Sequence, residues 1–196
     1  MPPRPLSPSR PEEAEPSFPS PRQAQVGRAA RRRGRLIHKL LEVLPDLAAE
    51  QRSAAARRLL AQPLYDLDGP AQEEILQATL GVLADPRLAA LFGPGSRAEV
   101  PLSGLLGRGA EAKAITGQVD RLLVREDEIL VIDYKTNRPA PQREADVAPL
   151  YLRQMASYRA VLAEIYPGRA IRCALLWTEG PRIMQLSDAS LVRYSP

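Results

Sequence analysis

The stretch that decides the fold is residues 117–137, which read Gly-Gln-Val-Asp-Arg-Leu-Leu-Val-Arg-Glu-Asp-Glu-Ile-Leu-Val-Ile-Asp-Tyr-Lys-Thr-Asn. Two apolar runs rich in Leu, Ile and Val flank a charged connection at Glu126-Asp127, which predicts an antiparallel β-hairpin. In a hairpin centred on that connection, facing residues have numbers that add up to 253. We therefore expect Asp120 to face Asp133.

Two carboxylates in this position repel each other, because facing Cβ atoms lie only about 4.5–5.5 Å apart. A hard divalent cation removes the repulsion, since Mg²⁺ and Mn²⁺ bind carboxylate oxygens and retain several waters. Lys135 lies two residues beyond Asp133 and shares its face of the strand. A lysine there can hold a water or stabilise a developing negative charge. Asp120, Asp133 and Lys135 together predict metal-assisted hydrolysis of a phosphate ester.

An Asp-x-Lys sequence by itself is more often a solvated strand end than a site. Here the preceding residues 129–132 are all apolar, and burying Asp133 and Lys135 beside them without partners would be costly. Lysine is also scarce, at positions 39, 113 and 135 only, in a chain whose other basic residues are arginines. The use of lysine at position 135 therefore indicates that this position needs a compact ammonium group rather than a guanidinium group.

The rest of the chain supplies helices before the hairpin and a helix and strands after it. Apolar periodicity predicts helices at 28–47 and 149–166, further helical segments over 48–92, and strands at 98–102, 115–125, 128–135, 171–178 and 182–186. This order predicts an α/β or α+β fold, with a mixed central sheet flanked by helices and an extra N-terminal helical region.

Composition divides the chain into a tail and one domain. Eight of the 20 prolines lie in the first 21 residues, so residues 1–27 are expected to be a disordered tail or linker. Residues 28–196 are expected to form a single domain, with a helical part at 28–92 and a strand-rich core at 93–196. The single cysteine excludes an internal disulfide, and no apolar run is long enough to span a membrane. We expect a reduced, cytoplasmic protein.

Several short segments, taken in order, resemble the PD-(D/E)XK nuclease superfamily. They are Gly117-Gln-Val-Asp120-Arg-Leu, Ile132-Asp133-Tyr-Lys135-Thr, and Gln154 with Tyr158 one helical turn later. More narrowly, they resemble the RecB-like nuclease domain that ends the AddA subunit of bacterial AddAB helicase-nucleases. Residues 34–42, Gly-Arg-Leu-Ile-His-Lys-Leu-Leu-Glu, are similar to that family's first-helix signature. The resemblance implies a restriction-endonuclease-like core.

The resemblance also implies roles for individual residues. The metal ligands, for Mg²⁺ or Mn²⁺, would be His38, Asp120, Asp133 and the carbonyl of Tyr134. Lys135 would be the catalytic lysine, and Gln154 and Tyr158 would contact DNA or the edge of the active site. Glu99 occupies the place of an acidic residue that some relatives use near the metal.

The partners expected are DNA and, by resemblance, a helicase motor and an AddB-like subunit that act in double-strand break repair and recombination. A basic patch precedes His38 and includes Arg31, Arg32, Arg33 and Arg35, which we expect to contact phosphates. No zinc finger or recognition-helix signature is present to read bases, so cleavage without base specificity is expected, by an exonuclease or an endonuclease. No phosphate-binding loop of the Gly-x-x-x-x-Gly-Lys-Ser/Thr type is present, so the chain itself is not expected to be the motor.

Two other functions fit parts of this pattern. One is a catalytically silent DNA-binding or docking module of a helicase complex, which the opposed acids and the lysine argue against. The other is a hydrolase of small phosphoesters, which the arginine-rich patch disfavours because such a patch suits a long polyanion.

Overall fold

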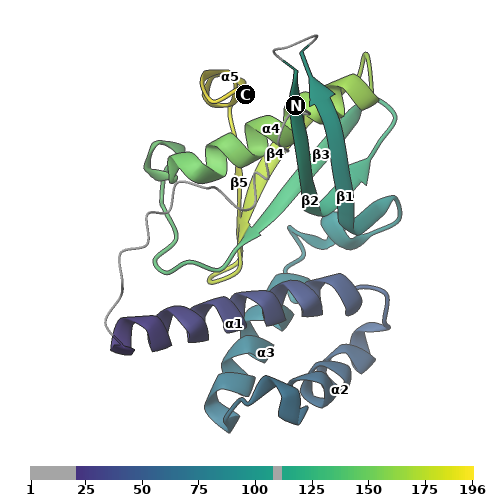
Figure 1. Ribbon diagram of the computed structural model, residues 1–196. Coiled ribbons are helices and arrows are strands. Elements are labelled where there is room, and N and C mark those ends of the chain that lie inside the picture. The colour runs from purple at the N-terminus through teal and green to yellow at the C-terminus, as the bar shows by residue number, and fades with distance from the viewer. Residues whose placement is uncertain (1–20, 108–111) are drawn as a thin grey trace.

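Five strands form one mixed sheet in the computed structural model, which describes residues 21–107 and 112–196 (Figure 1). The strands are β1 (Ser96–Leu106), β2 (Lys113–Val124), β3 (Glu128–Lys135), β4 (Ala170–Trp177) and β5 (Arg182–Gln185). They lie side by side in chain order. The β3–β4 pair is parallel and the other pairs are antiparallel. The mixed central sheet expected from the sequence is therefore present.

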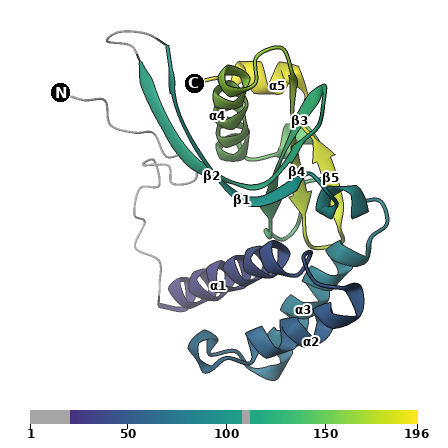
Figure 2. The same ribbon diagram turned by 90° about the vertical axis from the view of Figure 1, so that its right-hand side faces the viewer.

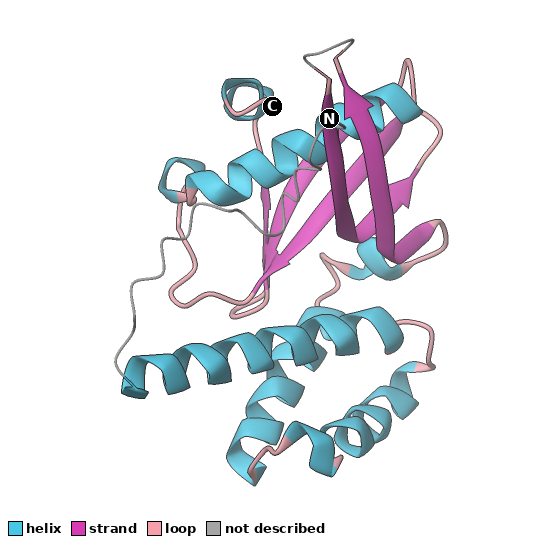
Figure 3. Cartoon of the chain, in the orientation of Figure 1, coloured by secondary structure: helices cyan, strands magenta, loops and turns pink. Residues whose placement is uncertain are grey.

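Helices cover both faces of this sheet (Figure 3). An N-terminal helical region contains α1 (Pro21–Val43), α2 (Ala49–Leu60) and α3 (Gly69–Ala84), with short 3₁₀ turns at Pro63–Tyr65 and Ala89–Phe92. The helix α4 (Pro149–Ile165) joins β3 to β4 after a 3₁₀ turn at Glu144–Asp146, and α5 (Asp188–Arg193) ends the chain. Figure 2 shows α4 on one side of the sheet and α1, α2 and α3 on the other.

The two sides of the sheet have separate hydrophobic cores because side chains of a strand alternate between its faces. On β3, Ile129 and Val131 pack in the core under α4. Ile132 and Tyr134 pack in the core formed with α1, α2 and α3. Asp133, between these last two residues, therefore belongs to the α4 side of the sheet.

The bounds of β2, β3, β4, β5 and α4 lie within two residues of the sequence expectations. The strand expected at 98–102 is longer, at Ser96–Leu106, and the helix α5 was not expected. The helix expected at 28–47 begins at Pro21, since proline is well suited to a first helical position. Residues 21–27 are thus helical, whereas the expected tail at residues 1–20 lies outside the described residues. The helix ends at Val43. The next residue, Leu44, precedes Pro45, and a residue before proline disfavours helical torsion angles. Within the part of the chain that the structure describes, no helix is both long enough and apolar enough to cross a bilayer.

The hairpin register is the one expected from the charged connection. The pairs are Arg121 with Ile132, Leu122 with Val131, Leu123 with Leu130 and Val124 with Ile129. Each pair adds up to 253, but the ladder stops one step before Asp120 and Asp133. The two acids therefore lie at the point where β2 and β3 cease to be hydrogen-bonded to each other, which frees this place for side-chain chemistry.

Candidate active site

A row of three acidic residues crosses the sheet at the end of that ladder. On β1 and β2, Ala98 pairs with Arg121 and Val100 pairs with Val119, so Glu99 lies opposite Asp120. Asp133 continues the row on β3. Glu99 has a φ of 50°, a left-handed conformation that is rare for a residue with a side chain and costs about 1–3 kcal/mol. The strained residue thus lies at one end of the acidic row, on the edge strand β1.

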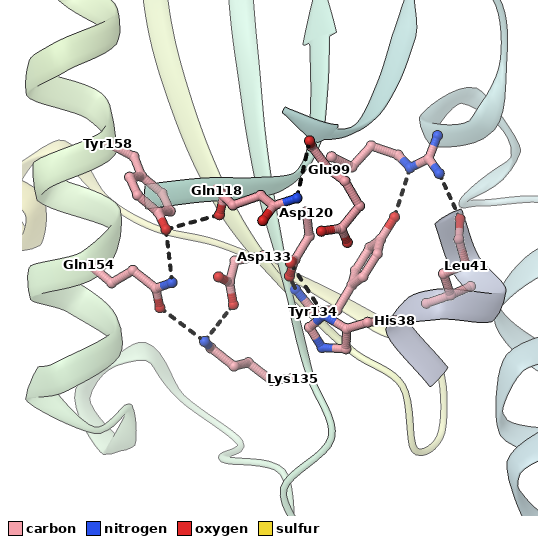
Figure 4. Close-up of polar contacts among 11 residues, drawn as sticks. His38, Leu41, Glu99, Gln118, Asp120, Asp133, Tyr134, Lys135, Gln154 and Tyr158 are labelled. Atoms are coloured by element: carbon pink, nitrogen blue, oxygen red, sulfur yellow. Dashed lines mark hydrogen bonds and ion pairs between the residues drawn. The ribbon is translucent and has the colours of Figure 1, made fainter. Parts of the chain in front are cut away.

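Glu99 and Asp120 form a compact cluster with His38 of α1 (Figure 4). One ligand atom from each of the three residues lies within 4.8 Å of the other two. Two ligands of one Mg²⁺ can be about 4.2 Å apart at most, twice the usual bond length, so only a small closure would be needed. The two carboxylates are donors that suit Mg²⁺ or Mn²⁺, whereas the imidazole suits a transition metal better than Mg²⁺. The cluster is therefore a possible site for a divalent cation.

Asp120 is oriented by two hydrogen bonds. Its Oδ2 accepts the backbone N–H of Tyr134 at 2.6 Å, across the open end of the hairpin. Its Oδ1 lies 3.2 Å from Nδ1 of His38. The Tyr134 ring packs edge-on against the His38 imidazole, with centroids 5.4 Å apart. Tyr134 thereby orients both candidate metal ligands: its backbone holds Asp120 and its ring holds His38.

Arg121 holds the hydroxyl end of the Tyr134 side chain in place. Its guanidinium donates to the Tyr134 hydroxyl at 2.7 Å and to the Leu41 carbonyl of α1 at 2.7 Å. A third bond reaches Oγ of Ser96 at 3.0 Å. Because Arg121 is buried, these bonds hold α1, and therefore His38, in place against the sheet.

Asp133 is close to the cluster, but its carboxylate turns toward Lys135. The two side chains form an ion pair, and both are buried, at 4% and 8% exposure. The sequence predicted Asp133 as a metal ligand beside Asp120, whereas the compact cluster contains Glu99 in that place. The physical reason is the close Lys135 ammonium, which attracts the Asp133 carboxylate. Metal binding by Asp133 and by the Tyr134 carbonyl stays a prediction.

The pKa shifts of Glu99 and Asp133 reflect burial first and repulsion between the acidic groups second. Burial and the Asp120 charge raise the pKa of Glu99. Burial and Asp120 also raise the pKa of Asp133, and outweigh the opposing effect of Lys135. Burial alone would lower the pKa of His38, but the hydrogen bond and charge of Asp120, with smaller contributions from Asp133 and Glu99, raise it. Such a site is stabilised by added positive charge.

A second chain of contacts starts at Lys135 and runs to α4. Lys135 Nζ donates to Oε1 of Gln154 at 3.2 Å, and the Gln154 amide donates to the Tyr158 hydroxyl at 3.3 Å. The Tyr158 hydroxyl in turn donates to the Gln118 carbonyl at 2.9 Å. A Cβ on Gly117 would lie 2.6 Å from the Tyr158 ring, so glycine is needed there. The structure thus brings the predicted Gln154 and Tyr158 to the edge of the site, where they orient Lys135.

Two adjoining cavities surround these residues. The inner one, of about 320 Å³, is lined by His38, Glu99, Gln118, Asp120, Asp133, Tyr134, Lys135, Leu150, Tyr151 and Gln154. The outer one, of about 650 Å³, shares several of these residues and adds Arg31, Arg35 and Lys39 of α1. These three basic residues are exposed and lie at four-residue spacing, hence on one helix face.

The other two arginines of the predicted patch point elsewhere. Arg32 donates to the carbonyls of Tyr65 and Asp66. Arg33 pairs with Glu74 of α3 at 2.6 Å. Both guanidinium groups connect α1 to other parts of the helical region. Only Arg31 and Arg35 of the predicted patch therefore line the cleft.

Sequence reasoning missed Tyr151 and Asn137. Lys135 Nζ lies 3.9 Å from the centroid of the Tyr151 ring, and Asn137 donates to the Tyr151 hydroxyl at 2.6 Å. The available signal was the position of Tyr151 three residues before Gln154, on the same face of the helix. The contact with Lys135 itself depends on how α4 docks on the sheet, which no local pattern encodes.

Comparison with known proteins agrees with this geometry. Residues 15–192 match the family model of the PD-(D/E)XK nuclease superfamily, so the chain belongs to that superfamily. A solved structure described as "Crystal structure of SSO0001" is similar at 14% identity and a TM-score of 0.38, covering 88% of this chain and 84% of that one. No curated protein matches the chain.

Proposed function

We propose that the chain is a Mg²⁺-dependent deoxyribonuclease that hydrolyses phosphodiester bonds without base specificity. The observation that carries the proposal is the joining of the His38, Glu99 and Asp120 cluster to the Asp133–Lys135 ion pair in one cleft. The superfamily match makes phosphodiester hydrolysis the reaction to expect of such a cleft. Mn²⁺ could replace Mg²⁺, because carboxylate and carbonyl ligands suit both cations.

The residues divide into those that hold the cation and those that act beside it. His38, Glu99 and Asp120 would hold it, with Asp133 and the Tyr134 carbonyl completing the set. A bound divalent cation would neutralise the scissile phosphate and lower the pKa of an attacking water. Lys135, aimed by Gln154, would orient that water or stabilise the negative charge that develops on the phosphate. Tyr158 and Gln118 keep Gln154 in position for this role.

The path proposed for DNA follows the exposed face of α1. Arg31, Arg35 and Lys39 are spaced about 6 Å apart along the helix axis at 1.5 Å rise per residue, and they lead to His38 along the wall of the outer cavity. Phosphate contacts of this kind position a strand without reading its sequence. They account for cleavage that does not depend on bases.

The finer role rests on the sequence resemblance to the nuclease domain of AddA. We propose an exonuclease that acts with a helicase motor and an AddB-like subunit during double-strand break repair and recombination. Residues 34–42 and 117–158 carry this resemblance. The partners are proposals that copurification with a candidate motor would have to establish.

The test is incubation of the chain with linear single-stranded and double-stranded DNA, with Mg²⁺ or with chelator. We expect degradation with Mg²⁺ only, and none by Asp120→Asn. Binding of DNA without cleavage by the wild-type chain would instead indicate a silent docking module. Hydrolysis of bis-p-nitrophenyl phosphate that DNA does not inhibit would indicate a small-phosphoester hydrolase.

A further inference from the structure

We infer that Tyr151 is a positioning residue for Lys135: the face of its ring holds the lysine ammonium at the cleft, and Asn137 holds the ring. The inference rests on the proposed nuclease function, in which Lys135 is the residue that acts beside the phosphate. It assigns a role to a side chain that the resemblance does not cover.

The ammonium group of Lys135 is held from three directions. The Tyr151 ring centroid lies 3.9 Å from Nζ, well inside the roughly 6 Å over which a cation is attracted to an aromatic face. Gln154 Oε1 accepts a hydrogen bond from the same nitrogen at 3.2 Å, and Asp133 supplies the ion pair. Because Lys135 is only 8% exposed, little water competes with these contacts, and the attraction to the ring is stronger than at a surface.

The Tyr151 ring is itself fixed. Asn137 Nδ2 donates to its hydroxyl at 2.6 Å, and Trp177 packs against it at an interplanar angle of 60° with centroids 6.4 Å apart. Asn137 lies two residues past Lys135 at the end of β3, and Arg33 of α1 donates to the adjacent Thr136 carbonyl at 3.2 Å. The ring is therefore supported by β3, β4 and α1, although its own backbone belongs to α4.

Fixing the ring has a consequence for the lysine. A lysine side chain has a long flexible stem and retains much rotational freedom when it is not held. A group that is already in place when the reaction begins loses less freedom in the transition state, which raises the rate without requiring tighter substrate binding. Removal of the ring should therefore lower kcat and leave the affinity for DNA unchanged.

The first experiment detects the contact without any activity. Lysine occurs at positions 39, 113 and 135 only, so protein labelled with ¹³C at lysine Cε gives three signals, and Lys135→Arg identifies one of them. Protons above an aromatic face resonate at higher field. We expect the Lys135 signal at higher field than the other two in the wild type and in Tyr151→Phe, and at an ordinary position in Tyr151→Leu.

A matched control lies at the other end of α4. Tyr166 is also half-buried and also has a cationic partner, Arg169, 5.5 Å from its ring. Tyr166→Leu should leave the Lys135 signal where it is. A Lys135 signal that is ordinary in the wild type, or that Tyr151→Leu does not move, would overturn the inference whatever the activity of the chain.

The second experiment separates positioning from contact with nucleic acid. Tyr151→Leu should lower kcat about tenfold, with Tyr151→Phe restoring most of the loss and Asn137→Ala falling between them. Binding of a labelled single-stranded oligonucleotide in Ca²⁺ should be the same for wild type and Tyr151→Leu. If Tyr151→Leu weakens this binding and leaves kcat unchanged, Tyr151 contacts DNA and the positioning role is wrong. An inactive wild type would refute the proposed nuclease function but not the contact seen by magnetic resonance.

Discussion

Asp120 and Tyr134 are joined across the open end of the β2–β3 hairpin by a hydrogen bond of 2.6 Å from the Tyr134 backbone N–H to Asp120 Oδ2. The bond replaces the ladder contact that ends one step earlier, at Arg121 and Ile132. The Asp120 carboxylate accepts the N–H that a backbone carbonyl would accept in a continuing ladder. A substitution of Asp120 must therefore keep a hydrogen-bond acceptor, even if it removes the charge.

Asp120→Asn keeps the acceptor for the Tyr134 N–H and removes one negative charge from the acidic row. We expect affinity for Mn²⁺, measured by calorimetric titration, to fall by more than about 100-fold. Thermal unfolding without metal should occur at higher temperature than in the wild type, because the Asp120 charge opposes ionisation of Glu99 and Asp133. Asp127→Asn, at the exposed turn of the same hairpin, is the control. Unchanged Mn²⁺ affinity in Asp120→Asn would exclude the cluster as the metal site.

Lys135→Ala should retain the cation and DNA while losing turnover. The lysine is not among the cation-binding donors, and a positioned group of this kind contributes about 10²–10⁴-fold to rate. Single-turnover cleavage with saturating Mg²⁺ gives the rate, and titration with Mn²⁺ gives the affinity. Wild-type turnover in this variant would show that Lys135 has no part in the chemistry.

The double substitution Arg31→Gln with Arg35→Gln should weaken DNA binding and its salt dependence. If each arginine contacts one phosphate, the slope of log K against log [salt] for a single strand should become less steep by about 1.4 in total. Fluorescence anisotropy at several salt concentrations measures this slope. Arg58→Gln, exposed on α2, should change neither quantity, and an unaltered slope in the double variant would place the DNA elsewhere.

Gly117→Ala should destabilise the protein by about 1–3 kcal/mol through overpacking. Its Cβ would lie 2.6 Å from Cε1 of Tyr158 and 2.8 Å from the hydroxyl oxygen, and both belong to a ring that is fully buried. Gly81→Ala is the matched control, since its Cβ meets nothing closer than 3.7 Å and alanine favours the helix by up to about 1 kcal/mol. Chemical denaturation should therefore give changes of opposite sign for the two variants.

Glu74→Gln tests the contact between α3 and the segment after β3. Burial opposes the shift, but hydrogen bonds and charge from Arg33 and Arg138 outweigh it and lower the pKa of Glu74. A lowered pKa stabilises the fold above the ordinary glutamate value of 4.5 and loses this effect as pH falls through the folded pKa. We expect the variant to be less stable by about 0.5–1 kcal/mol at pH 7.

The pH dependence gives the check on this ion pair. In urea unfolding, the difference between wild type and Glu74→Gln should shrink as the pH is lowered below 4.5. Glu50→Gln, on the exposed surface of α2, should show no difference at either pH. A deficit that stays constant with pH would mean that packing, rather than charge, accounts for the loss in Glu74→Gln.

Local sequence signals were sufficient for the strands and for the hairpin register. The charged connection at 126–127 and the apolar runs beside it are read over a few residues, and counting from that connection gave the observed pairs. The left-handed conformation of Glu99 could not be predicted in this way, because nothing nearby in the sequence demands it. Glu99 adopts this conformation on β1, opposite Asp120 of β2, and it lies beside Asp120 and His38.

The same limit applies to the basic patch. Arg31, Arg32, Arg33 and Arg35 are alike in sequence, and only the docking of α3 decides which of them are used internally. Arg33 is drawn to Glu74, 41 residues away. Helix periodicity could have separated Arg31 and Arg35, which share the face of His38, from the other two.

The position of His38 on α1, beside Glu99 and Asp120 of the sheet, links ion binding to the assembly of the chain. Its helix belongs to the N-terminal region, whereas Glu99 and Asp120 belong to the sheet. A cation bound by all three residues would connect α1 to the sheet. Docking of α1 on the sheet and binding of the cation would therefore strengthen each other. Removal of the cation should weaken the packing of α1 against the sheet before it destabilises the sheet itself.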